Sequence, residues 1–201
     1  MKSSPHIHLK LKLCVSGAAE TGHCAPDMLD KTKELGKEII AADGVLVTGA
    51  TTGAPLWAAI GAKEANGFVI GFSPASSEVE HVKKYHLPLD YHDVVVYTGF
   101  GYSGRNLFLT RAADGVFITC GRIGTLNEFT VAFEDQKPIG VLVGTGGIAD
   151  ELENILEKAH RGASNVVFDR DPKTLVRKVV ELVKKEKVTE VPINRQTADG
   201  K

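Results

Sequence analysis

Residues 115–128, GVFITCGRIGTLNE, contain the transition that decides the fold of this chain. Gly115 to Thr119 is apolar and of strand length, and a helix-like run extends from Leu126 to about Glu134, so a glycine-rich turn opens directly onto a helix. Backbone N–H groups at a helix start lack partners, and the helix dipole favours negative charge there. With the Thr125 hydroxyl nearby and Glu128 about one turn further on, the segment predicts a site for a phosphorylated small molecule.

The same alternation of strand-length and helical segments extends along the chain. It predicts an α/β fold, a doubly wound and mostly parallel sheet of about seven strands with helices on both faces. The expected strands are 9–15, 45–48, 68–71, 94–98, 116–119, 139–143 and 166–168, and the expected helices are 27–42, 54–65, 104–113, 125–135, 148–160 and 172–186. Residues 72–93 are expected to form a long connection instead of a full crossover helix.

Local signals mark several helix ends. Asp43-Gly44, Asn66-Gly67 and Asp114-Gly115 each end a helical run with a pair suited to a left-handed C-terminal cap. Asp171-Pro172 starts the last helix, with an N-cap aspartate before proline at the first helical position.

Composition limits the size and the partners of the protein. With 201 residues, of which 43% are hydrophobic, we expect one domain over residues 1–189 and a polar, unstructured tail at 190–201. The 24 basic and 25 acidic residues nearly cancel, and no dense basic run is present, so a nucleic-acid polymer is not an expected partner. The sequence has no signal peptide and no apolar run of membrane-spanning length, which predicts a soluble, cytoplasmic protein without membrane contact.

Cysteine and histidine residues give no strong signal of metal or redox chemistry. Cys14, Cys24 and Cys120 form no CxxC pair and cannot build a disulfide framework. A thiolate role for Cys14 or Cys120 at a strand end is conceivable, but buried apolar cysteines are the commoner outcome. No metal site is expected, because the remaining candidates lack acidic and cysteine neighbours and are interpreted as surface or capping residues: His6, His8, His81, His86 and His92.

Glycine-rich segments follow three of the expected strands. In parallel α/β sheets ligands bind beyond the carboxyl ends of the strands, so all three should meet at one edge. They contain the ligand-binding candidates Gly17, Gly49, Gly53, Gly121, Arg122, Gly124 and Thr125. A GxGxxG turn after the first strand and a GxxxxGK[ST] loop are both missing, which disfavours a conventional NAD domain and a P-loop nucleotidase and leaves a smaller site suited to one phosphate.

Arg105 is a further candidate for this edge. The stretch Gly99 to Gly104 precedes it and has the composition of a mobile cover, and a helix then begins at Arg105-Asn106. The guanidinium could reach a ligand phosphate or a leaving base; the alternative is a surface ion pair worth under about 1 kcal/mol. Arg111, near the end of the helix, more simply complements the dipole or an acidic neighbour.

Together these residues resemble a known family. Gly104-Arg105-Asn106, the strand 113–118, the turn 120–128 and the segment 137–142 resemble the Lonely-guy (LOG) family and its Rossmann-like superfamily, which includes molybdenum-cofactor carriers and chains once labelled lysine decarboxylases. The family motif PGGxGTxxE is degenerate here as CGRIGTLNE. The resemblance implies that Arg105 and Glu128 are catalytic and hydrolyse a nucleoside 5'-monophosphate to free base and ribose 5-phosphate, with the glycine-threonine turn on the phosphate.

Two departures from the motif are expected to weaken catalytic turnover more than ligand binding. Cys120 replaces a proline and Arg122 replaces a glycine, and a left-handed backbone at position 122 would cost roughly 1–2 kcal/mol. Arg122 could instead recognise a second acidic group, so the alternative function is a non-catalytic carrier or sensor of a phosphorylated pterin or nucleotide, similar to molybdenum-cofactor carriers. A scaffold with a decayed site is a third hypothesis. No resident cofactor is expected, because the residues for pyridoxal chemistry are missing.

The expected helix around residues 55–62 is nearly apolar on all sides. Such a helix is either deeply buried or shared with another subunit. Since the family that the chain resembles commonly forms dimers, we expect a homodimer.

Overall fold

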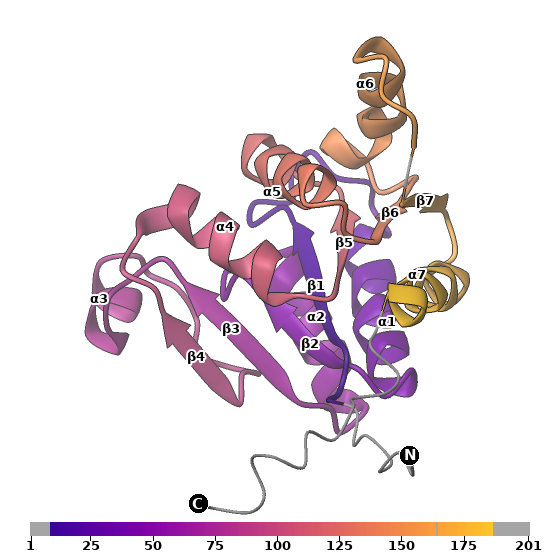
Figure 1. Cartoon of the computed structure of the whole chain (residues 1–201). Helices are drawn as coiled ribbons and strands as arrows, with labels where there is room; N and C mark the ends of the chain where they lie inside the picture. Colours follow the sequence, from indigo (N-terminus) through magenta and orange to yellow (C-terminus); the bar gives the residue numbers. More distant parts are fainter. Residues whose placement is uncertain (1–8, 164, 187–201) are drawn as a thin grey trace, which may run out of the picture.

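The computed structural model describes residues 9–163 and 165–186, and these build a seven-stranded sheet in which every strand pair is parallel (Figure 1). The strand order is β4-β3-β2-β1-β5-β6-β7, so the order reverses between β1 and β5. The strands are Lys12–Gly17 (β1), Val45–Thr48 (β2), Val69–Ser73 (β3), Val94–Tyr97 (β4), Gly115–Thr119 (β5), Ile139–Leu142 (β6) and Val166–Asp169 (β7). The doubly wound α/β fold expected from the sequence is confirmed.

The helices also follow the expected order, with differences at their ends. They are Met28–Ala41 (α1), Ala54–Glu64 (α2), Glu78–Lys83 (α3), Gly101–Ala112 (α4), Ile123–Glu134 (α5), Leu152–Lys158 (α6) and Pro172–Glu186 (α7), with a 3-10 helix at Gly147–Glu151 (η1). α5 begins before the run expected from Leu126, so Gly124 and Thr125 are already helical. The connection 72–93 contains the short α3, whose N-cap Ser77 accepts a hydrogen bond from Glu80 N.

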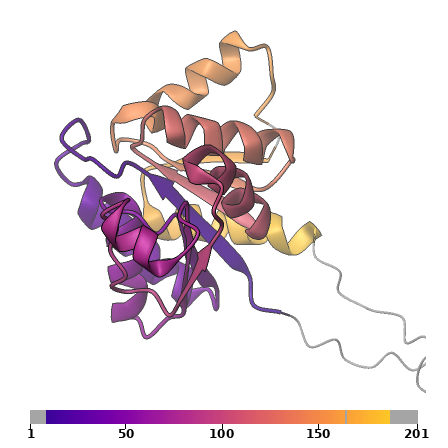
Figure 2. The ribbon, with the colours of Figure 1, turned by 90° about the vertical axis from the view of Figure 1, so that its left-hand side faces the viewer.

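Helices lie on both faces of the sheet (Figure 2), and an apolar layer of side chains packs between the sheet and the helices on each face. The first packs α1, α2 and α7 on one face, around Leu13, Leu35, Phe117 and Val179. The second packs α4, α5 and η1 on the other face, around Val116 and other buried side chains such as Leu109, Phe129 and Leu152. Because both faces are covered, β1 and β5 are apolar almost throughout, as buried parallel strands require.

Helix α2 is apolar because it is buried against other elements of the same chain. It packs closely on α1: a Cβ at Gly61 would fall 1.9 Å from the carbonyl oxygen of Lys33, and one at Gly36 would fall 2.1 Å from that of Ala58. Glycine at both positions therefore lets the two backbones touch. The composition of α2 gives no argument for a dimer.

The predicted helix caps are confirmed at three places and wrong at one. Asp43 and Asn66 have the left-handed backbone expected of C-terminal caps, with φ of 60° and 56°. Asp171 Oδ1 accepts from Thr174 N at 2.8 Å, as an N-cap should. Asp114 is not left-handed; its carboxylate accepts from the backbone and side-chain nitrogens of Lys12 and so ties β1 to the start of β5.

Histidine 81 corrects another expectation. Interpreted from the sequence as a surface or capping residue, it is instead fully buried, with Nδ1 2.8 Å from Ser73 Oγ and Nε2 3.1 Å from the Pro88 carbonyl oxygen. It packs α3 onto the sheet, which a polar residue can do because both ring nitrogens find partners. His86 is exposed, as expected.

Some expectations concern residues outside the described part of the chain. These are His6 and His8 and the polar tail 190–201. Within the described ranges, none of the helices is both long and apolar enough to cross a bilayer.

Candidate ligand-binding site

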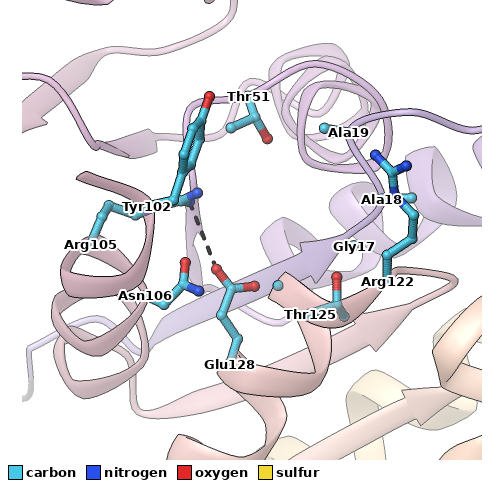
Figure 3. A pocket seen from close by; sticks show the side chains of 11 residues that line it. Gly17, Ala18, Ala19, Thr51, Tyr102, Arg105, Asn106, Arg122, Thr125 and Glu128 are labelled. Carbon is cyan, nitrogen blue, oxygen red and sulfur yellow. Dashed lines mark ion pairs between the residues drawn. The ribbon is translucent and has the colours of Figure 1, made fainter. Parts of the chain in front are cut away.

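A pocket of about 250 Å³ lies beyond the carboxyl ends of β1, β2 and β5, where the strand order reverses (Figure 3). The turns after these strands and the first turns of α4 and α5 form its wall. The lining residues are Gly17, Ala18, Ala19, Thr51, Tyr102, Arg105, Asn106, Arg122, Gly124, Thr125 and Glu128. The expected meeting of the three glycine-rich segments at one edge is therefore observed.

The N-terminus of α5 faces this pocket. Leu126 N donates to Arg122 O, so the amides of Ile123, Gly124 and Thr125 precede the first intrahelical bond. No atom would lie within 4 Å of a Cβ at Gly124, so there is open space beside this residue on the first turn of α5. Gly121 has φ +89°, and a Cβ there would lie 2.5 Å from the side chain of Thr125, so this turn requires glycine. The arrangement suits an anion.

Arg105 lies on the first turns of α4 and is buried, at 6% exposure. The Nη1 of Arg105 is 3.8 Å from Glu128 Oε1, and its Nε has no hydrogen-bond partner among the described residues. The guanidinium rests on Gly49, where a Cβ would fall 1.6 Å from Nη1. The side chain is thus a buried cation with unused donor capacity at the pocket wall.

Glu128 lies opposite Arg105 and is equally buried. The hydroxyl of Ser16 donates to one of its carboxyl oxygens. Burial raises the pKa of the Glu128 carboxyl, while Arg105 and Ser16 act in the opposite direction without overcoming it. Arg105 and Glu128, which the sequence predicts to lie together, form an ion pair at the wall of the pocket (Figure 3).

Arg122 stands at the rim. Its backbone is extended, with φ −130°, so the left-handed strain considered for this position does not arise; the left-handed residues are Cys120 and Gly121. Its guanidinium pairs with Glu20 at 3.0 Å, and both side chains are more than half exposed. Such a pair is worth at most about 1 kcal/mol, which leaves Arg122 free to exchange Glu20 for an anionic ligand.

Tyr102 and Asn106 were missed as individual candidates. Tyr102 belongs to the glycine-rich stretch expected to cover the site, and its ring lies 5.8 Å from the Arg105 guanidinium carbon. With its amide nitrogen toward Glu128, Asn106 donates to Glu128 Oε1 at 2.8 Å and to the Tyr102 carbonyl at 3.0 Å. Only the helical geometry of α4 could reveal them, because residues 102, 105 and 106 share one face of a helix.

The other glycine candidates occupy different positions. Gly17 lines the pocket, and a Cβ there would fall 2.7 Å from both Ala54 Cβ and Thr119 O. Gly53, at φ +68°, is packed against the backbone of Ala18 and Ala19. Gly49 underlies Arg105. Gly49, Gly53 and Gly121 are therefore behind the lining residues and shape the turns that form the pocket.

The cysteines correct the sequence-based expectation. Cys24 and Cys120 form a disulfide across 96 residues, whereas no disulfide was expected and Cys120 was interpreted as a buried thiol. Cys14 is free and buried, as expected, and burial raises the pKa of its thiol. The spacing of the cysteines in the sequence could not reveal this disulfide. The two sulfurs come together only because β1, which precedes Cys24, pairs with β5, which precedes Cys120. His23 lies with the two cysteines within 4.8 Å, and it was also overlooked.

Comparison with known proteins agrees with this architecture. The model of the SLOG cluster4 family matches residues 10–176. The chain belongs to the SLOG cluster4 family. A protein of Archaeoglobus fulgidus described as uncharacterized is 26% identical over 132 residues, covering 66% of this chain and 82% of its own length.

Similar solved structures include two molybdenum-cofactor proteins. The molybdenum cofactor binding protein of Rippkaea orientalis has a TM-score of 0.68 and 27% identity, covering 89% of this chain and 98% of that one. The molybdenum cofactor carrier protein of Chlamydomonas reinhardtii has a TM-score of 0.69 and 26% identity, covering 88% and 99%. The Rossmann-like fold and the LOG-like family membership inferred from residues 104–142 are confirmed.

Proposed function

We propose that this protein binds and carries a phosphorylated pterin of the molybdenum-cofactor type in the pocket at the strand ends. The observation that carries the proposal is the buried Arg105, whose Nε has no partner among the described residues. A buried cation with unused donors is costly unless a ligand completes its contacts. The ligand in this proposal is anionic.

Other features of the pocket support a ligand with a flat ring and more than one acidic group. Arg122 adds a second guanidinium at the rim, and the free amides of α5 suit one phosphate. Tyr102 offers an aromatic face for a heterocycle. The described functions of the Rippkaea orientalis and Chlamydomonas reinhardtii proteins agree with such a ligand.

The state of Glu128 favours carriage over hydrolysis. An oxocarbenium-like transition state is stabilised by an ionised carboxylate. Burial instead favours the neutral carboxyl of Glu128 and raises its pKa. In the proposed carrier, this carboxyl shapes the pocket wall through its hydrogen bonds with Ser16 and Asn106.

A loading experiment tests the carrier. Ligand-free protein is mixed with molybdenum cofactor released from a molybdoenzyme and desalted, and the retained pterin is oxidised and measured by fluorescence. We expect retention by the wild type and at least about tenfold weaker binding for Arg105→Ala and Arg122→Ala, since a charge-assisted contact contributes roughly 1.5–3 kcal/mol.

The matched control is Arg111→Ala. Arg111 lies on the same helix as Arg105, but its guanidinium pairs with Asp135 at 2.9 Å outside the pocket. This variant should bind like the wild type. Wild-type protein that retains no pterin, or an Arg111→Ala loss equal to that of Arg105→Ala, contradicts the proposal.

A second candidate is hydrolysis of a nucleoside 5'-monophosphate to free base and ribose 5-phosphate. The specific observation in its favour is the meeting of Arg105 and Glu128 at 3.8 Å in one pocket that also contains Thr125. The test is release of free base from a panel of nucleoside monophosphates. Release that disappears in both Glu128→Gln and Arg105→Ala supports the enzyme, whereas tight binding of the nucleotide without release supports a nucleotide carrier.

The proposal includes a cytoplasmic homodimer. Support for the dimer comes from α4, where Phe100 and Phe108 stack at 5.2 Å while both remain exposed, at 65% and 45%. Sedimentation velocity of the wild type and of Phe108→Ser tests the assembly. A monomer at all concentrations contradicts it.

A further inference from the structure

We propose that the Cys24–Cys120 disulfide is a thiol-exchange site, opened in the folded protein by a dithiol reductant, that controls the order of the pocket rim. The bond joins two segments that border the pocket. Cys24 lies in the connection between β1 and α1, and Cys120 directly precedes the turn Gly121-Arg122. This inference concerns the protein without ligand, so it does not depend on which molecule the pocket binds.

The two cysteines differ in accessibility. Cys120 is completely buried, whereas Cys24 is only partly buried. Exchange requires an incoming thiolate to approach one sulfur in line with the bond to the other. The geometry therefore makes Cys24 the attacked residue and Cys120 the leaving group.

Cys120 packs in an apolar cluster, and the side chain of His23 offers a polar contact to its sulfur. His23 Nε2 lies 3.3 Å from the Gly121 carbonyl oxygen and 3.6 Å from Cys120 Sγ. Because a carbonyl only accepts hydrogen bonds, the Nε2 facing it carries the proton, and this N–H is also presented to the sulfur. The N-terminus of α5 begins at Ile123, close to Cys120 in the chain, and its dipole favours negative charge.

The reaction balances with a dithiol as the named co-reactant. Its thiolate attacks Cys24 Sγ, a mixed disulfide forms, and Cys120 leaves with the electron pair of the broken S–S bond. The second thiol of the reductant then attacks the mixed disulfide and releases Cys24. The dithiol is oxidised to a disulfide by two electrons, and its two protons end on Cys24 and Cys120.

Opening the bond should loosen the rim of the pocket. The connection after β1 also contains Glu20, which pairs with Arg122. This connection therefore contacts the turn Gly121-Arg122 in two ways, through the Glu20–Arg122 pair and through the disulfide to Cys120. Other contacts also hold these segments: Ala25 N donates to Thr145 O at 3.0 Å, and Cys120 N donates to Thr145 Oγ1 at 2.8 Å. These two bonds hold the bases of the segments, whereas residues 19–23 are held by contacts that involve exposed or partly exposed side chains: the Thr52 hydroxyl on the Ala19 carbonyl, the Glu20–Arg122 pair and the His23–Gly121 contact.

The first experiment measures the rate of reduction. Native protein is mixed with increasing dithiothreitol, and alkylated Cys24 and Cys120 are followed by peptide mass spectrometry, which separates them from Cys14. We expect a rate that rises linearly with dithiothreitol and is several-fold slower in His23→Asn. The matched control is His160→Asn, an exposed histidine in the connection after α6, which should react like the wild type.

The second experiment measures backbone hydrogen exchange in oxidised and reduced protein. Amides of residues 19–24 and 121–125 should exchange at least several-fold faster after reduction, and Cys24→Ser should show the faster exchange without reductant. A reduction rate that stays at the global unfolding rate whatever the dithiothreitol concentration overturns the proposal. So do equal rates in His23→Asn and His160→Asn, or unchanged exchange at the rim.

Discussion

At the scale of single residues, the pocket depends on the contact between Arg105 and Glu128. Each is buried, and each has other partners: Gly49 supports the guanidinium, and Ser16 donates to the carboxyl. The pair is 3.8 Å apart, too far for a good charge-assisted hydrogen bond. Glu128 is completed by Ser16 and Asn106, whereas the Nε of Arg105 has no partner among the described residues and remains available to a ligand.

Glu128→Gln should make the ligand-free protein more stable relative to the wild type as the pH rises. Burial raises the pKa of this carboxyl, so between its unfolded and folded pKa the native state binds more protons and wild-type stability falls with increasing pH. The glutamine has no such dependence. Urea unfolding of both proteins from pH 4 to about pH 8 measures the difference. A stability difference independent of pH contradicts the prediction.

Gly49→Ala should weaken pterin retention about as strongly as Arg105→Ala. The new Cβ would fall 1.6 Å from Arg105 Nη1 and displace the guanidinium, although the backbone of Gly49 itself is not left-handed. The loading assay described above measures the effect. Gly22→Ala is the control, because no atom lies within 4 Å of its added Cβ. Unchanged retention in Gly49→Ala would show that pterin binding does not depend on the position of the Arg105 guanidinium.

At the scale of elements, two helix contacts position the site. The N-terminus of α5 follows β5 through a turn that needs Gly121, and its amides point to the pocket. On the other face, α1 and α2 pack so closely that their backbones touch at Gly36 and Gly61. This packing fixes Ala54 against Ala18, since Ala54 N donates to Ala18 O at 2.8 Å, and so holds the turn after β1.

Gly36→Ala and Gly61→Ala should each destabilise the protein by about 1–3 kcal/mol, despite the better helix propensity of alanine. The added Cβ atoms would collide with backbone carbonyls, which cannot move without separating the helices. Gly124→Ala, with open space in α5, is the matched control and should not destabilise. Urea unfolding measures all three. Equal stability of Gly61→Ala and the wild type is the contrary outcome.

At the scale of the whole molecule, the disulfide links the first and the second halves of the sheet. Cys24 follows β1 and Cys120 follows β5, and these strands are neighbours at the reversal of strand order. The bond thus closes a loop that includes β2, β3 and β4 with their helices. A cross-link over so long a loop limits the unfolded chain more than it adds native contacts.

Cys24→Ser should therefore lower the free energy of unfolding by about 2–4 kcal/mol relative to the oxidised protein. Thermal and urea unfolding with and without dithiothreitol measure this. The wild type should lose a similar amount on reduction, whereas the variant should not respond to the reductant. A response of Cys24→Ser equal to that of the wild type would assign the effect to something other than this disulfide.

Much of the fold was accessible from local patterns. The expected strands 45–48 and 139–143 lie almost where the structure has them. A buried strand is a run of consecutive apolar residues, so both its burial and its length can be predicted locally. Cap residues such as Asp43 and Asp171 located helix ends for the same reason. Asp114 was misassigned because its partner, Lys12, is distant in sequence.

The sequence by itself determined the parallel α/β alternation, the glycine-rich turn at residues 121–125 that opens onto a helix, and the candidates Arg105 and Glu128, since each rests on patterns in short stretches of the chain. Only the tertiary structure decided that His81 is buried, that Tyr102 and Asn106 line the pocket, and that Cys24 bonds Cys120. These outcomes depend on contacts between residues far apart in the chain. Their distances are set by how the sheet orders its strands, which no local pattern encodes.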